Sequence, residues 1–167
     1  LLSSPSWSET TRDDLVKRDG LYYKKFTDVP FTGEITGQLQ GSIKDGKKEG
    51  EWVYYLENGQ LLSKGEYKNG KKEGEWVTYW ENGQLESKIK YKNDKMQGKF
   101  FYYTDKGELE AKGEYKNGKA AGYWVEYREN GQLWYKGEYK DDKRVGEWVE
   151  YKENGQLDKK GKYKDDE

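Results

Sequence analysis

The sequence predicts an all-β fold, an elongated single-layer twisted antiparallel sheet built of 24-residue hairpin repeats. Three observations lead to this prediction. The segment GEWVYYLENGQLLSKGEYKNGKKE returns in varied form every 24 residues, starting at Gly50, Gly74, Gly98, Gly122 and Gly146. A fixed period of roughly 20–50 residues is typical of repeat architectures. Each copy also holds two runs rich in aromatic and β-branched residues, and each run ends at a turn-forming pair.

The first run of each copy is strand-like. It reads Trp52-Val53-Tyr54-Tyr55 in the first copy and returns at 76–79, 100–103, 124–127 and 148–151. Asn58-Gly59 follows, and an Asn-Gly pair between two such runs favours a two-residue type I′ turn, in which both residues need a positive φ. The second run, 61–67, ends at another turn, Asn69-Gly70. One repeat is therefore one hairpin plus its connection to the next.

A two-residue turn at Asn58-Gly59 also predicts how the two strands pair. The expected pairs are Leu56–Leu61, Tyr54–Ser63 and Trp52–Gly65. Paired residues share a face of the sheet, so one face should collect Gly50, Trp52, Leu61, Gly65 and Tyr67. The opposite face, with Val53 and Tyr55, should be wetter. A three-residue loop with a bulge would instead shift the pairing by one residue.

The strand glycines are expected to make room for indole rings, because a ring can lie over a residue without a side chain. We expect Trp52, Trp124 and Trp148 to lie over Gly65, Gly137 and Gly161 of their own hairpins. Ile89 replaces this glycine in the second copy, so the indole of Trp76 should take a different pose.

The repeated residues form the pattern G-x-W-x-x-Y-x-x-N-G-x-L-x-x-x-G-x-Y-x-x-G. In the first copy they are Gly50, Trp52, Tyr55, Asn58-Gly59, Leu61, Gly65, Tyr67 and Gly70. This pattern resembles the MORN (membrane occupation and recognition nexus) repeat, in the variant form common in bacterial proteins. The chain departs from it at Ile89 and at three turn positions, Asp94, Asp142 and Asp166. Some bacterial members of this family are labelled antitoxins of toxin–antitoxin pairs, so the resemblance implies a protein partner.

The segments before the repeats divide the chain into three parts. Residues 1–19 are expected to be a signal-peptide remnant and a linker, residues 20–49 atypical capping strands, and residues 50–167 the five repeats. Leu1–Ser8 ends an apolar run with a small-x-small cleavage pattern before Glu9, which predicts export to the periplasm, cell surface or medium. The alternative is an ordinary flexible N-terminus. Residues 11–16 are expected to form a helical turn or part of a linker.

Residues 20–49 are expected to cap the array, because terminal units of repeat proteins are often atypical. Gly20–Lys25 has the character of a strand, and the stretch from Phe31 to Glu49 resembles a shortened repeat. Together with the repeats, these segments predict roughly a dozen antiparallel strands and almost no helix.

The composition argues against most kinds of chemistry. There is no His and no Cys, so the usual general base, the thiol nucleophile and the usual zinc ligands are absent. Asp141-Asp142 and Asp165-Asp166 occupy turn positions where Asp replaces Asn or Gly without any metal. No phosphate-binding glycine motif occurs, so we expect no catalytic residue, cofactor, metal or small-molecule substrate. Lys+Arg 31 against Asp+Glu 32 gives no basic excess for nucleic acid.

A binding surface remains, and the residues that differ between copies are the best candidates for it. The apolar ones at otherwise polar positions are Tyr54, Leu62, Trp80, Tyr102, Trp134 and Tyr135. Exposed aromatic side chains are typical anchors for partners, although these residues could also simply thicken the packing of the sheet. The sequence predicts an exported, non-enzymatic protein–protein interaction module. The alternatives are a cytoplasmic antitoxin-like partner of a toxin and a binder of lipid or membrane surfaces.

Overall fold

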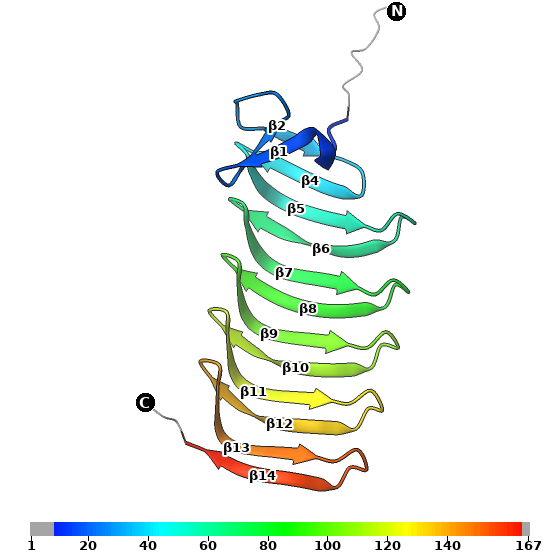
Figure 1. Ribbon diagram of the computed structural model, residues 1–167, viewed down its shortest axis with the longest axis vertical. Coiled ribbons are helices and arrows are strands. Elements are labelled where there is room, and N and C mark those ends of the chain that lie inside the picture. Colours follow the sequence, from blue (N-terminus) through cyan, green and yellow to red (C-terminus); the bar gives the residue numbers. More distant parts are fainter. Residues whose placement is uncertain (1–8, 165–167) are drawn as a thin grey trace, which may run out of the picture.

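The hairpin repeats form one long open sheet. The computed structural model describes residues 9–164, so the predicted signal-peptide remnant lies outside the described residues. A 12-stranded antiparallel sheet and a separate two-stranded sheet make up this part of the chain. Figure 1 shows the hairpins stacked along the long axis in a single layer, ending at β14. The predicted all-β repeat sheet is confirmed.

In the large sheet each strand pairs only with its neighbours in the chain, as expected for consecutive hairpins. Its strands are β3 (Gly33–Ile35), β4 (Leu39–Lys44), β5 (Lys47–Tyr55), β6 (Leu61–Lys68), β7 (Lys71–Tyr79), β8 (Leu85–Lys92), β9 (Lys95–Tyr103), β10 (Leu109–Lys116), β11 (Lys119–Tyr127), β12 (Leu133–Lys140), β13 (Lys143–Tyr151) and β14 (Leu157–Tyr163). No helix within residues 9–164 is long and apolar enough to cross a membrane.

The N-terminal end of the stack carries a short hairpin of β1 (Leu15–Arg18) and β2 (Leu21–Lys24) (Figure 1). A single 3₁₀ turn, η1 (Arg12–Asp14), precedes it, where a helical turn or linker was expected. The expectation of a linker fails for β1. Its first residue, Leu15, is 3% exposed and joins the core cluster with Ile35 and Ile43 of the large sheet, which ties the segment down.

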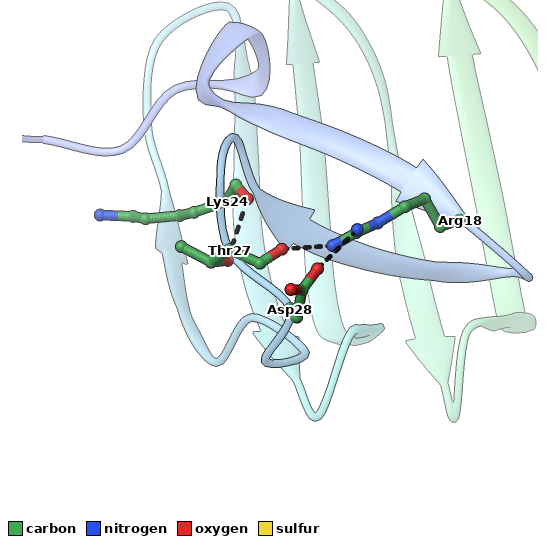
Figure 2. A network of polar contacts seen from close by, with 4 residues as sticks. All are labelled: Arg18, Lys24, Thr27 and Asp28. Carbon is green, nitrogen blue, oxygen red and sulfur yellow. Dashed lines mark hydrogen bonds and ion pairs between the residues drawn. The ribbon is translucent and has the colours of Figure 1, made fainter.

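A polar network holds the loop that follows β2. Figure 2 shows Arg18 reaching across to Asp28, with its Nη1 donating to Oδ1 at 2.9 Å, and to the backbone carbonyl of Thr27. The Thr27 hydroxyl in turn donates to the carbonyl of Lys24 at 3.0 Å. These contacts fix the loop against the β1–β2 hairpin.

The turn at Asn58-Gly59 is a three-residue loop, so the predicted two-residue type I′ turn is wrong there. The Gly59 N–H donates to the Leu56 carbonyl at 2.9 Å, and the Leu56 N–H donates to the Gln60 carbonyl at 2.8 Å. Only Gly59 has a positive φ, 82°. The Asn58 side chain instead accepts the Gln60 N–H at 3.0 Å, which explains why Asn suits this position.

Type I′ geometry occurs at the opposite end of the hairpins. Asn69 and Gly70 have φ values of 51° and 79°, and the flanking Lys68 and Lys71 form the last pair of β6 and β7. Two positive φ values in a two-residue loop define this turn. The two turn types therefore alternate along the array, one at each end of the strands.

A bulge restores the predicted pairing beyond the three-residue loop. Tyr55 pairs with Leu61 and Tyr54 with Ser63, which leaves Leu62 unpaired as the extra residue. The predicted pairs Tyr54–Ser63 and Trp52–Gly65 are confirmed, whereas Leu56–Leu61 does not form. Leu61 consequently shares the face of Tyr55 and Val53 instead of the face of Trp52.

A second bulge joins successive hairpins. Lys64 pairs with Val77 and Glu66 with Glu73, so a single residue of β6, Gly65, lies opposite three residues of β7. The first of these three, Gly74, has a φ of 67°. Bulges bend a strand, and Figure 1 shows the odd-numbered strands curving before they cross the sheet.

This bulge places each indole over the glycine of the preceding hairpin. A Cβ added to Gly65 would lie 2.2 Å from Cδ2 of Trp76, and one added to Gly137 would lie 2.2 Å from Cδ2 of Trp148. Trp52 covers Gly41 and Trp124 covers Gly113 in the same way, whereas nothing lies within 4 Å of a Cβ on Gly161. The expected placement over Gly65, Gly137 and Gly161 of the same hairpins is therefore wrong.

Ile89 affects the following repeat rather than its own. Trp76 keeps the common pose, with Nε1 donating to the Glu66 carbonyl at 3.1 Å, so the expectation of a different pose is wrong. The residue of the next hairpin that pairs with Ile89 is Phe100, the one position where Phe replaces the repeated Trp. A smaller ring there leaves room for the isoleucine side chain.

The face opposite the indoles is drier than expected. Val77, Val125 and Val149 on this face are at most 8% exposed. Lys64 pairs with both Val53 and Val77, and similar lysines recur in every repeat. The aliphatic stems of such lysines can cover apolar neighbours while their amines stay in water.

Candidate binding face

One face of the sheet carries a ladder of aromatic rings. The equivalent residues of the five first strands, called the Trp row below, are Trp52, Trp76, Phe100, Trp124 and Trp148. Tyrosines of the second strands lie between them at T-shaped angles, as with Tyr67–Trp76 at 5.1 Å and Tyr139–Trp148 at 4.9 Å between ring centroids. Edge-to-face contacts of this kind stabilise beyond simple burial. The ladder thus contributes the bulkiest buried side chains of this single-layer sheet, Trp52 and Phe100 among them.

Cationic side chains cover the ladder in three repeats. Lys48 Nζ lies 4.1 Å from a ring centroid of Trp52, and Lys72 Nζ lies 4.3 Å from Trp76. Arg144 Cζ lies 4.4 Å from Trp148. Each is four residues before its Trp, a position called the lid position below. Cation–π contacts at these distances are favourable.

The lid position loses its charge in the middle of the array, where it holds Met96 and Ala120. Trp52, Trp76 and Trp148 are at most 5% exposed, and Phe100 beside Met96 is 1% exposed. Trp124 is the one member of the Trp row that stays partly exposed. Its Nε1 donates to the Glu114 carbonyl at 3.2 Å, as Trp148 does to Glu138 at 3.1 Å, and also donates to the Ala121 carbonyl at 3.0 Å, so the pose is similar to that of Trp148 but not identical. The small Ala120 side chain at the lid position accounts for the partial exposure of the Trp124 ring.

A carboxylate accompanies the open indole. Glu126 is two residues after Trp124 on the same strand and therefore on the same face. Its equivalent in the fifth repeat, Glu150, binds Arg144 at 3.3 Å. Glu126 is half-buried, and burial, followed by the nearby charge of Glu110, raises the pKa of its carboxyl group. The described residues contain no group of three or more metal-ligating side chains that could hold an ion.

Three of the six predicted partner-binding residues share a row with Glu126. Cross-strand pairing links Leu39, Tyr54, Ser63, Thr78, Ser87, Tyr102, Ala111, Glu126, Tyr135, Glu150 and Lys159 in order. Tyr54, Tyr102 and Tyr135 therefore lie on the indole face, and all three are half-buried. Tyr54 on β5 and Tyr135 on β12 are seven strands apart, about 34 Å at ~4.8 Å per strand.

The other three predicted residues lie near the three-residue loops. Leu62 and Trp134 are the unpaired bulge residues of their strands. Trp134 is 41% exposed and contacts Tyr135, with 5.3 Å between centroids. Trp80 is half-buried just after β7, and its Nε1 donates to the Tyr103 carbonyl at 2.9 Å. The six residues do not form one continuous patch, and Trp134 with Tyr135 is the pair that the structure brings into ring contact.

An acidic pocket lies at the same loops. It has a volume of about 320 Å³ and is lined by Trp80, Thr104, Asp105, Lys106, Glu108, Glu110 and Glu129. Four of these seven side chains are carboxylates, namely Asp105, Glu108, Glu110 and Glu129. Glu110 connects the pocket to Glu126, whose carboxyl group it influences. Carboxylates therefore gather near the partly exposed indole, although Lys106 also lines the pocket and Arg144 lies 5.7 Å from the ring of Tyr135, the residue that pairs with Glu126.

Comparison with known proteins decides the family. A family model described as MORN repeat variant matches residues 48–69, 72–93, 96–117, 121–141 and 144–165. The chain belongs to this MORN repeat family. MORN repeats are non-catalytic modules that generally mediate protein or membrane interactions. The predicted resemblance is confirmed.

Other comparisons add little to the family. No curated protein matches the chain. Among solved structures, a crystal structure of a GtfA/B complex bound to UDP and GlcNAc is similar, with 17% sequence identity and a TM-score of 0.26. The match covers 83% of this chain and 25% of that chain, so the chain spans a quarter of its length.

Proposed function

We propose that this chain is a non-enzymatic module that binds a protein partner through the indole face of its sheet. One observation carries the proposal: in the middle of the array the charged lid is absent and the ring of Trp124 is partly exposed. Tyr102, Trp134 and Tyr135 lie on or beside the same face in neighbouring hairpins. Aromatic side chains at the centre of an interface contribute much of its binding energy.

Capture and reconstitution test this function. The full chain is used as bait, each captured protein is purified, and its affinity is measured by calorimetry. Trp134→Ala should weaken a true partner by roughly thirtyfold, the effect of losing about 2 kcal/mol at an anchor. The unfolding midpoint should barely change, because Trp134 is exposed. An unchanged affinity would exclude Trp134 from the interface, and the absence of any partner that binds after purification would contradict the module function.

We also propose that the module is exported, on the pattern of Leu1–Ser8, which lies outside the described residues. Sequencing the N-terminus of the mature protein should find Glu9 or a close neighbour. A protein retained in the cytoplasm with these residues intact would instead favour the antitoxin-like alternative.

One observation favours a membrane surface as a second target. Phe26 is 104% exposed and has a φ of 65°, a conformation that costs roughly 1–2 kcal/mol for a non-glycine residue. Lys24 and Lys25 beside it are exposed, while Asp28 forms an ion pair with Arg18 at 2.9 Å. An exposed ring among exposed cations suits an anionic lipid surface.

Vesicle sedimentation tests the membrane function. The full chain should bind phosphatidylserine vesicles and not phosphatidylcholine vesicles. Phe26→Gly should abolish this binding without lowering the unfolding midpoint, because glycine adopts the positive φ freely. Equal sedimentation of the variant would exclude the Phe26 loop as the lipid contact.

A further inference from the structure

The fourth repeat has Ala120 at the lid position, where three other repeats have a lysine or an arginine. We propose that the partly exposed indole of Trp124 binds a lysine or arginine side chain of the partner protein, at the place that Lys48, Lys72 and Arg144 fill in their own repeats. This inference rests on the proposed function and specifies the chemistry of its contact face.

The fifth repeat shows the filled form of the same site. The guanidinium of Arg144 lies 4.4 Å from the Trp148 ring, forms an ion pair with Glu150 at 3.3 Å, and lies 5.9 Å from the Tyr163 ring. In the first repeat, Lys48 similarly contacts Trp52 and donates to the Tyr54 hydroxyl at 2.8 Å. A cation bound between an indole and an acceptor is thus the resident arrangement of this fold.

The fourth repeat keeps every part of this arrangement except the cation. Trp124 provides the ring, Glu126 the carboxylate and Tyr139 the second ring, while Ala120 occupies the lid position. Tyr139 lies 5.1 Å from Trp124, closer than Tyr67 to Trp52 at 6.0 Å. An incoming cation therefore moves Tyr139 outward by about 1 Å, to the spacing of the first repeat.

The carboxylates near Glu126 favour a basic partner, and Arg144, which also lies near the site at 5.7 Å from the Tyr135 ring, is already paired with Glu150. Glu126 has no lid cation of its own repeat, whereas Glu150 has Arg144. Glu110 lies close enough to Glu126 to influence its ionisation, and the adjacent pocket adds Glu108 and Glu129. Surface potentials of opposite sign steer association and select partners. A basic side chain would pair with Glu126 and cover the indole in one step.

Titration with a small arginine peptide tests the site on the full chain. The probe is N-acetyl-Gly-Arg-Gly-amide, and its matched control replaces arginine by the uncharged isostere citrulline. The signal followed is the indole Nε1–H resonance of Trp124, assigned with Trp124→Phe. We expect the arginine peptide to shift this resonance in a saturable way, the citrulline peptide to leave it unchanged, and Glu126→Gln to weaken binding about tenfold.

Two lid variants provide the decisive control. Ala120→Arg places a cation at the lid position of the fourth repeat, so it should abolish probe binding at Trp124. Ala120→Lys, which copies the lid residue Lys48 of the first repeat, is used if the arginine variant does not fold. Arg144→Ala removes a resident lid and should create a second probe site over Trp148. Equal binding of the citrulline peptide, or undiminished binding to the lid variants, would overturn the proposal, as would no shift up to the solubility limit of the peptide.

Failure of this inference can be told apart from failure of the proposed function. A purified partner that binds wild type and Ala120→Arg with equal affinity overturns the cation site and leaves the binding module intact. Probe binding at Trp124 without any partner that survives purification supports the site and contradicts the protein-binding function. A partner weakened at least tenfold by Ala120→Arg supports both.

Discussion

Replacing Gly137 by alanine should destabilise the protein, whereas the same change at Gly161 should not. A Cβ on Gly137 would lie 2.2 Å from Cδ2 and 2.4 Å from Cε2 of Trp148, a side chain that is 2% exposed. Gly161 occupies the same repeat position, yet nothing lies within 4 Å of its Cβ site. Neither glycine has a positive φ, so the backbone tolerates alanine at both and the comparison isolates the indole.

The expected cost follows from the overlap. Non-bonded carbons pack at roughly 3.5–4.0 Å, so the indole of Trp148 must retreat by more than about 1 Å. Overpacking of a filled site costs about 1–3 kcal/mol, while alanine in place of an unconstrained strand glycine gains about 0.5 kcal/mol.

Thermal unfolding followed by circular dichroism measures the difference between the two variants. A chain of this size loses about 2–4 °C of its unfolding midpoint per kcal/mol, so Gly137→Ala should melt several degrees below Gly161→Ala. Equal midpoints, or a more stable Gly137→Ala variant, would show that Trp148 does not lie over this glycine.

Two further predictions concern single residues of the indole face. Phe100→Trp should lower the unfolding midpoint because Ile89 occupies the space of the larger ring, and Ile89→Gly should relieve this cost in the double variant; additive midpoints would refute the pairing. Burial, followed by the charge of Glu110, raises the pKa of the Glu126 carboxyl group. Protonated Glu126 therefore contributes to the stability of the folded protein at acid pH, and this contribution is lost as the pH rises through the raised pKa. Glu126→Gln should therefore stabilise the protein at neutral pH and differ little from wild type near pH 4, as unfolding at the two pH values will show.

The repeat period and the Asn-Gly pairs sufficed to predict the sheet, because periodicity and turn chemistry are local properties of the sequence. The type of each turn was less accessible. Asn58-Gly59 and Asn69-Gly70 are the same dipeptide, yet the first closes a three-residue loop and the second a type I′ turn. The pairing of Trp52 with Gly65 was predicted correctly although the turn was wrong, because the bulge at Leu62 compensates for the longer loop.

The direction of the indoles depends on contacts between hairpins. The glycine of its own hairpin and the glycine of the preceding hairpin both lie on the same face of the sheet as an indole. The bulge at Gly74 and its equivalents decides which of these two glycines the indole covers. A prediction based on a single hairpin does not include contacts between hairpins, so it assigned each indole to the glycine of its own hairpin instead of the preceding one.

The open site at Trp124 was missed for a related reason. In a flat strand, residues four apart are separated by about 13 Å, so Ala120 does not suggest itself as a neighbour of the Trp124 ring. The positive-φ glycine between them, Gly122 at 62°, bends the strand and brings the lid position next to the indole. The lid position changes along the sequence from Lys48 and Lys72 through Met96 and Ala120 to Arg144. Only the bend shows that this change decides whether a cation covers the indole.

The central claim is that the residue at the lid position decides whether an indole of the Trp row is open. Hydroxyl-radical footprinting of the full chain, read by mass spectrometry, compares Trp124 with Trp76 and Trp148 in one experiment. The structure predicts stronger oxidation of Trp124 than of Trp76 and Trp148, with Ala120→Arg protecting Trp124 as well. Equal oxidation of the three indoles, or no effect of Ala120→Arg on Trp124, would contradict the claim.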